Sequence, residues 1–208
     1  MQDMSFDADR KLKKRVQLAL FLVPVVLISA CDRLSVQKSM AGSEYTMFDQ
    51  YGEKISFPDS YQGKVMLVGY VYTHCPDICP LITYNMRDIQ DEFKGREELM
   101  MVSISFDPER DSPEILYDYA NNYRLDQSNW RLLTGDRKVI DQALNDLEIR
   151  TLKTPTRFTD DGRPQYFIDH TDKVTLIDRS GNIRNTYPGS EMNTEEIVDD
   201  IHTLLMEN

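Results

Sequence analysis

Two cysteines four positions apart carry the clearest chemical signal in the sequence. Cys75 and Cys79 lie in Tyr72–Pro80, which reads YTHCPDICP and follows a run of apolar residues. That run predicts a buried strand and the residues after it predict a helix, so both thiols are expected at a helix N-terminus. Backbone N–H groups and the helix dipole favour negative charge there, which makes thiolate available as a nucleophile or a metal ligand.

The spacing of the two thiols bears on which chemistry they perform. Residues at i and i+4 of a helix face the same side, so the two sulfurs can share one ion or, after adjustment, form a disulfide. A thioredoxin-type redox motif has two residues between its cysteines, whereas Pro76, Asp77 and Ile78 intervene here. The difference weakens the interpretation as an ordinary oxidoreductase, and an inert buried pair is the remaining alternative.

Three histidines are available as a nitrogen ligand, and His170 is the strongest candidate. It follows Asp169, which can orient nearby groups, in a segment expected to form a loop before a late hairpin. Judged by residue type alone, an ordinary surface or core role for His170 is the more common one. His74 adjoins Cys75, but a side chain at a strand end can point away from its neighbour, and His202 falls in the predicted last helix.

The chemistry of the donor atoms narrows the choice of metal. Two sulfurs and one imidazole suit Cu(I) in a site of low coordination number, since soft ligands favour it over hard cations. Zinc is the alternative, although it would require a fourth ligand. The residues therefore indicate copper, as Cu(I) or Cu(II).

The hydrophobic pattern predicts the elements that position these side chains. Strands are expected in a small hairpin over Tyr45–Asp49 and Ile55–Phe57, over Val65–Tyr72, Leu99–Phe106 and Trp130–Leu133, and in a late hairpin over Lys173–Ile177 and Ile183–Tyr187. Helices are expected over Ile78–Phe93, from Pro113 to about Tyr123 after a cap at Asp111 or Ser112, over Asp136–Leu147, and from Asn193 to about Met206. This order predicts an α/β, thioredoxin-like fold with a mixed central sheet flanked by helices.

The N-terminal segment has the pattern of an export signal. Basic residues at positions 11–15 precede the apolar run Val16–Ala30, and Cys31 follows it. The run is shorter than the roughly 20 residues of a spanning helix, and Pro24 interrupts it. The sequence LISAC before and at Cys31 resembles a bacterial lipobox, which implies cleavage and lipidation of Cys31. An uncleaved anchor with an ordinary cysteine is the alternative.

These patterns divide the chain into three regions. We expect a signal peptide with lipobox, or a membrane anchor, over residues 1–31, a tether over 32–44, and the thioredoxin-like domain over 45–208. Because the basic residues precede the apolar run, the domain is expected on the extracytoplasmic, periplasmic side of a bacterial inner membrane. Asp32 directly after Cys31 resembles a signal for retention in that membrane.

Composition excludes one large class of partner. The chain has 208 residues and a formal net charge of -11, with 40% hydrophobic and 28% charged residues. This balance is typical of one folded domain. An acidic surface repels phosphate backbones, so no nucleic-acid partner is expected.

Three blocks of the sequence resemble the Sco/SenC family. They are YTHCPDICP at Tyr72–Pro80, SISFDPERDSPE at Ser103–Glu114, and Tyr166–Gly181, where Asp-His is followed by VTLIDRSG. With Leu132–Gly135 they span most of residues 45–190. Peroxiredoxins and ordinary thioredoxins share the fold but lack the cysteine block combined with the downstream Asp-His. The family commonly has a spanning anchor, so the lipobox is a variation.

The resemblance implies a thioredoxin-like domain that binds copper through Cys75, Cys79 and His170. Asp77 and Asp169 are expected beside these ligands, where they can orient them. It also implies a role in assembling the dinuclear copper centre of cytochrome c oxidase. The expected partners are the copper-centre subunit of the oxidase, the membrane, and other copper chaperones or thiol reductases.

Three mechanisms remain open on these residues. A metallochaperone would hold copper with the reduced thiols and His170 and release it by ligand exchange, and we favour this mechanism. In a thiol-disulfide reductase, Cys75 would attack a partner disulfide, Cys79 would resolve the mixed disulfide, and His170 would matter little. A copper or redox sensor would use the same site to signal to a membrane partner. Enzymatic activity is expected only in the second case.

Overall fold

A six-stranded mixed sheet forms the centre of the fold. The computed structural model describes residues 34–162 and 164–207. The strand order is β1 (Lys38–Ser39), β12 (Asn182–Tyr187), β11 (Val174–Ile177), β4 (Val65–Val71), β5 (Leu99–Ser105) and β6 (Trp130–Leu133). Strands β4, β5 and β6 are parallel, whereas β11 is antiparallel to both β4 and β12. The predicted mixed sheet and the late hairpin are confirmed.

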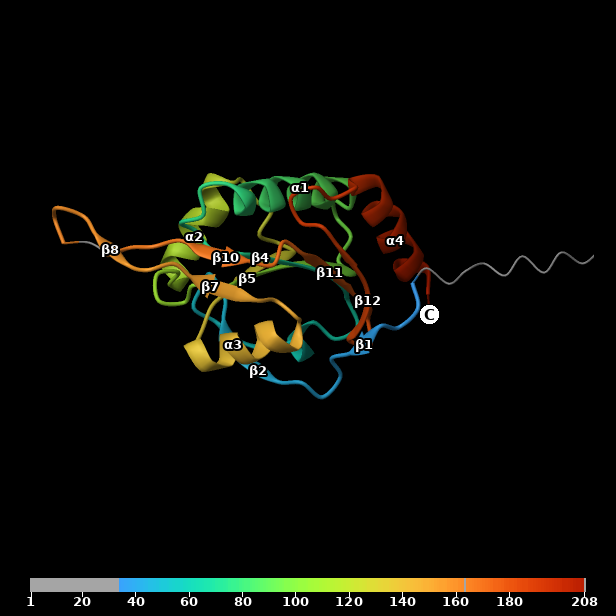
Figure 1. Ribbon diagram of the computed structural model, residues 1–208. Coiled ribbons are helices and arrows are strands. Elements are labelled where there is room, and N and C mark those ends of the chain that lie inside the picture. The colour runs from blue at the N-terminus through green and yellow to red at the C-terminus, as the bar shows by residue number, and fades with distance from the viewer. Residues whose placement is uncertain (1–33, 163, 208) are drawn as a thin grey trace, which may run out of the picture. The chain divides into compact units, whose positions relative to one another are not determined.

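Helices and a hairpin cover the two faces of this sheet. Helices α1 (Ile78–Glu92) and α4 (Thr194–Met206) lie together on one face, and α3 (Arg137–Asp146) lies on the other with the hairpin of β2 (Tyr45–Phe48) and β3 (Lys54–Phe57) (Figure 1). Helix α2 (Pro113–Asn122) follows β5, and a 3-10 turn covers Asp59–Tyr61. Strands β4 and β5 are buried at every position, as expected of strands covered on both faces.

The parallel pairing of β4 and β5 brings two loops together. Residues Tyr72–Pro80, which carry Cys75 and Cys79 and are called the cysteine segment below, follow β4. The turn that leads to α2 follows β5. Both strands end at the same edge of the sheet, where the N–H of Phe106 donates to the carbonyl oxygen of Val71 at 3.1 Å. The residues after both strands are therefore neighbours.

A separate two-stranded ribbon carries His170. Strand β7 (Thr151–Lys153) pairs antiparallel with β10 (Ile168–His170), and between them β8 (Arg157–Phe158) pairs with β9 (Pro164–Gln165) in an arm that projects from the domain (Figure 1). This ribbon was not predicted, because its strands have only two or three residues, too few to show an alternating pattern. The prediction of a loop at His170 is wrong, since His170 ends a strand.

The N-terminal end of the described chain also differs from expectation. Strand β1 pairs with β12, and Leu34 and Met40 are buried in the core. This strand lies inside the segment predicted as a tether. The predicted export signal with Cys31 lies outside the described residues. Over 34–162 and 164–207, none of the helices has the length and apolar character needed to cross a membrane.

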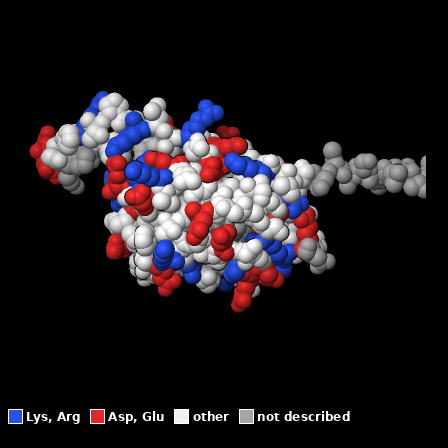
Figure 2. Space-filling model, turned by 90° about the horizontal axis from the view of Figure 1, so that it is seen from below, with Lys and Arg blue, Asp and Glu red and all other residues white. Residues whose placement is uncertain are grey.

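Charges are mixed on the surface of the domain. Acidic and basic side chains are interspersed on the face seen in Figure 2, with no continuous basic area.

Candidate metal centre

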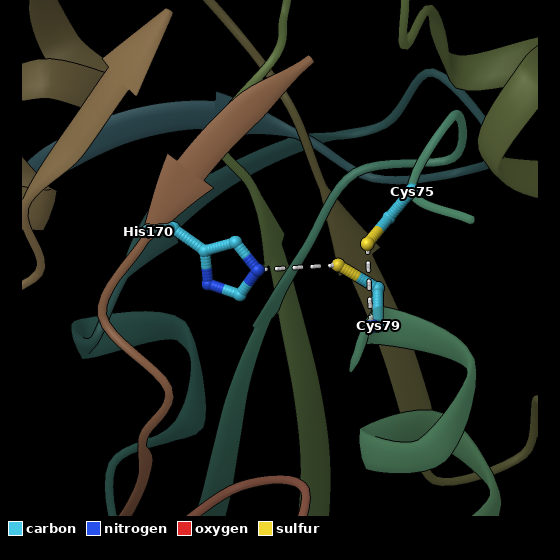
Figure 3. A group of neighbouring side chains, drawn as sticks. All are labelled: Cys75, Cys79 and His170. Carbon is cyan, nitrogen blue, oxygen red and sulfur yellow. Dashed lines mark hydrogen bonds between the residues drawn. The ribbon is translucent and has the colours of Figure 1, made fainter. Parts of the chain in front are cut away.

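The structure brings Cys75, Cys79 and His170 together at the edge of the sheet. Their ligand atoms all lie within 4.8 Å of one another, and His170 Nε2 lies 3.7 Å from Cys79 Sγ (Figure 3). Metal–nitrogen and metal–sulfur bonds of about 2.0–2.3 Å place ligand atoms at such separations around one ion. Cys79 is fully buried, whereas Cys75 is partly exposed, so one side of the group is open to solvent.

The sulfur of Cys75 occupies the position of a helix cap. Helix α1 has Asp77 at its N-cap, and the side chain of Asp77 makes no capping hydrogen bond. Instead, Cys75 Sγ accepts the backbone N–H of Cys79 at 3.4 Å. A capping acceptor normally comes from the N-cap side chain, and a negative charge there is stabilised by the helix dipole. The local fold therefore favours Cys75 as a thiolate.

The two thiols differ in their affinity for a proton. The hydrogen bond with Cys79, together with weaker bonds from His170 and from backbone N–H groups, lowers the pKa of Cys75 to about 3 although burial opposes the change. The hydrogen bond with Cys75 and burial raise the pKa of Cys79. The reduced site thus pairs a Cys75 thiolate with a Cys79 thiol.

The ring of His170 is fixed with Nε2 toward the sulfurs. Its Nδ1 lies 3.0 Å from the carbonyl oxygen of Thr171. A carbonyl only accepts, so Nδ1 carries the hydrogen and Nε2 is left facing Cys79. Burial lowers the pKa of His170, but hydrogen bonds with Cys75 and Thr171 outweigh it and the pKa is raised. Phe106 packs on the ring with centroids 4.6 Å apart.

The other predicted site residues lie at the margin of the group. Asp77 is exposed, and its contribution to Cys75 comes through its backbone N–H. Asp169 is exposed and, as the strand neighbour of His170, is directed to the opposite face of β10. The exposed His74 contacts the Thr73 hydroxyl through Nδ1 at 3.1 Å, and His202 packs on Phe93 with ring centroids 4.8 Å apart.

Several groups around the site were not assigned a role from the sequence. The carbonyl of Thr171 and the ring of Phe106 contact the His170 ring only through the folded arrangement of the chain, which the sequence pattern does not indicate. The turn Asp107–Asp111 belongs to the block SISFDPERDSPE, a family motif for which the sequence indicates no function. Tyr72 also had no role assigned from the sequence. Its hydroxyl accepts the N–H of Ile168 at 3.3 Å and so links the end of β4 to the start of β10.

Known proteins match both the sequence and the fold. A family model described as SCO1/SenC matches residues 35–206. The SCO1 protein homolog of Bacillus subtilis is 30% identical over 160 residues, 76% of this chain and 79% of that one. The SCO2-like protein of Rickettsia felis is 30% identical over 67% of this chain, which spans 65% of that relative, just under two thirds.

Solved structures agree with the fold described above. The structure of Bradyrhizobium japonicum ScoI with copper bound has 28% identity and a TM-score of 0.67, covering 79% of this chain and 99% of that one. A SCO1/SenC family lipoprotein from Bacillus anthracis has 27% identity and a TM-score of 0.66, covering 82% and 99%. The predicted thioredoxin-like fold is confirmed. By sequence and by structure, the chain belongs to the SCO1/SenC family.

Proposed function

We propose that this chain is a copper metallochaperone that supplies the dinuclear copper centre of cytochrome c oxidase. The observation that carries the proposal is the convergence of two sulfurs and one imidazole nitrogen within 4.8 Å. This soft donor set suits copper, with Cys75 Sγ, Cys79 Sγ and His170 Nε2 as ligands. Copper is bound in the related Bradyrhizobium protein, and another relative is described as a member of a family of cytochrome c oxidase assembly proteins.

The arrangement of the ligands supports release as well as binding. Three protein ligands leave room for a fourth, which a thiolate of the recipient can supply. Cys79 is buried and Cys75 and His170 are partly exposed, so the recipient approaches from the side of Cys75 and His170. Cys75 is already a thiolate near neutral pH, so copper can be taken up without first removing a proton from that sulfur.

A thiol-disulfide reductase is the second candidate. Cys75 and Cys79 are not joined in a disulfide. A thiolate at the more exposed Cys75 next to a thiol at the buried Cys79 is the arrangement of an attacking and a resolving cysteine. His170 is the residue that separates the two functions, because copper binding needs a third ligand and disulfide reduction does not.

The proposed location is the outer face of a bacterial inner membrane. We infer export from the basic and apolar segments before Cys31, and lipidation of Cys31 from the lipobox-like sequence. The Bacillus anthracis relative is described as a lipoprotein. Metabolic labelling with a palmitate analogue should mark the wild-type chain and not Cys31→Ala, and equal labelling of both would contradict this inference.

The function can be tested by gene replacement in the source organism. The copper-centre content of the oxidase would be measured in membranes from strains carrying wild type, Cys75→Ser, His170→Ala, or the control His202→Ala. The metallochaperone proposal predicts loss of the copper centre in the first two variants and normal content in the control. Normal content in His170→Ala with loss in Cys75→Ser would overturn it in favour of the reductase.

A further inference from the structure

The turn between β5 and α2 places two buried carboxylates beside the metal centre. Asp107 is 1% exposed and Asp111 is 0% exposed, although neither is among the ligands. Aspartates are almost never fully buried unless they are paired with hydrogen-bond donors or cations. The partners of these two residues therefore indicate what the turn does.

Asp111 holds the start of the cysteine segment. Its Oδ1 accepts the hydroxyl of Thr73 at 2.6 Å, and its Oδ2 accepts the backbone N–H of Thr73 at 3.2 Å and the hydroxyl of Ser105 at 2.6 Å. Thr73 stands two residues before Cys75. The position of the first sulfur ligand along the edge of the sheet is thus tied to Asp111.

Asp107 and Arg110 bind Tyr166, which precedes β10, the strand that carries His170 and is called the histidine strand below. The hydroxyl of Tyr166 donates to Asp107 Oδ1 at 2.8 Å, and Arg110, which is paired with Asp107, donates to the carbonyl oxygen of Tyr166 at 3.3 Å. The guanidinium also stacks on the Tyr166 ring, 3.6 Å from its centroid. Tyr166 stands four residues before His170, at the entrance to β10.

The two sets of contacts meet within the turn. The N–H of Asp111 donates to the carbonyl oxygen of Asp107 at 3.0 Å, and Ser105 Oγ accepts the N–H of Asp107 at 3.0 Å while donating to Asp111. The ribbon of β7 and β10 is not a strand pair of the main sheet. His170 is joined to the main sheet by the short chain link to β11. Apart from that link, side-chain contacts rather than a shared ladder of backbone hydrogen bonds hold β10 beside the cysteines.

We propose that the turn Asp107–Asp111 is a clamp that sets the distance between the cysteine pair and His170. Asp111 is the positioning residue for the cysteine segment, and Asp107 with Arg110 positions the histidine strand through Tyr166. The inference rests on the proposed copper site. It assigns a positioning role to part of the block SISFDPERDSPE. Because groups outside the ligand set orient metal ligands, loosening the clamp should weaken copper binding without removing a ligand.

Tyr166→Phe tests the clamp with the smallest change. It removes the hydroxyl bonded to Asp107 and keeps the ring on Arg110. The matched control is Tyr70→Phe, which removes another buried tyrosine hydroxyl, 2.9 Å from Thr175 Oγ1 in the core. Competition of the full-length chain against a Cu(I) chelator should show about tenfold weaker binding for Tyr166→Phe and no change for Tyr70→Phe. Equal affinities of Tyr166→Phe and wild type would overturn the inference.

A double variant separates positioning from general loosening of the fold. If Tyr166 acts through His170, Tyr166→Phe should not weaken copper binding further once His170→Ala is present. An undiminished effect in that background would refute positioning through His170. Failure of the wild-type chain itself to bind Cu(I) would instead refute the proposed function.

The other half of the clamp can be tested by rescue. Asp111→Ala leaves Thr73 and Ser105 without their acceptor and should weaken copper binding. Asp111→Asn keeps one oxygen that can accept from the Thr73 N–H and the Ser105 hydroxyl, and its amide N–H can donate to the Thr73 hydroxyl oxygen, which is itself able to accept. It should therefore restore most of the affinity. Equal weakening in both variants would contradict a positioning role based on these hydrogen bonds.

Discussion

The sulfur of Cys75 combines two tasks that usually belong to different residues. It accepts a backbone N–H at the start of α1, as a capping side chain does, and it faces Cys79 and His170 as a ligand. Both tasks favour negative charge, so capping and metal binding support each other. The sequence predicted this thiolate because the cysteine block follows an apolar run. It did not predict that the sulfur would replace the side chain of Asp77 as the capping acceptor.

Alkylation should distinguish the two thiols in the reduced, metal-free chain. Since hydrogen bonding lowers the pKa of Cys75 to about 3, this thiol is ionised throughout the range above that value. Its rate of reaction with iodoacetamide should stay nearly constant between about pH 5 and 8, whereas an ordinary thiol slows about tenfold for each pH unit below its pKa. Peptide mapping by mass spectrometry should find Cys75 modified before Cys79. A rate that falls tenfold per unit would contradict the assignment.

At the scale of elements, the start of α1 differs from the starts of the other helices. The side chains of Ser112, Asp136 and Asn193 each accept a backbone N–H as caps of α2, α3 and α4. The cap at Asn193 was predicted from the sequence, and Ser112 was one of two candidates with Asp111, because small polar residues precede apolar periodic segments. The short strands β7 and β10 could not be predicted, since they form by pairing between residues that are distant in the chain.

Alanine substitutions at two caps test this difference. Asn193→Ala removes a side-chain acceptor from the N–H of Glu196 and should lower the free energy of unfolding by about 1 kcal/mol. Asp77→Ala removes a side chain that makes no capping bond, so it should change stability much less. Urea titration of the metal-free, reduced chain measures both. A loss in Asp77→Ala as large as that in Asn193→Ala would show that Asp77, not Cys75, caps α1.

At the scale of the whole domain, the two ends of the described chain are joined on the sheet edge opposite β6. Arg184 on β12 donates to the carbonyl oxygen of Leu34, to Asp178 at 3.2 Å, and to Glu207 at 2.6 and 2.9 Å. The sequence predicted the layers of the domain from its alternating strands and helices. It could not predict this junction, because Leu34 and Arg184 lie far apart in the chain and their segments have no pattern that pairs them.

Removal of this arginine should destabilise the whole domain. Arg184 and Asp178 are largely buried. Arg184→Met leaves the poorly solvated Asp178 carboxylate without its cationic partner and should lower the free energy of unfolding by about 3 kcal/mol. The control is Arg96→Met, because Arg96 and Glu98 are about half exposed and their pair should contribute little. Thermal unfolding followed by circular dichroism measures both variants. Equal effects would contradict the structural role of the junction.

The central claim is that Cys75, Cys79 and His170 together bind one copper ion. The most direct measurement is a titration of the full-length, reduced chain against a Cu(I) chelator of known affinity, for wild type, His170→Ala and the control His202→Ala. We expect one tightly bound copper in wild type and His202→Ala, and clearly weaker binding in His170→Ala. If none of the three chains competes for copper, or if His170→Ala binds as tightly as wild type, the proposed metal centre is wrong.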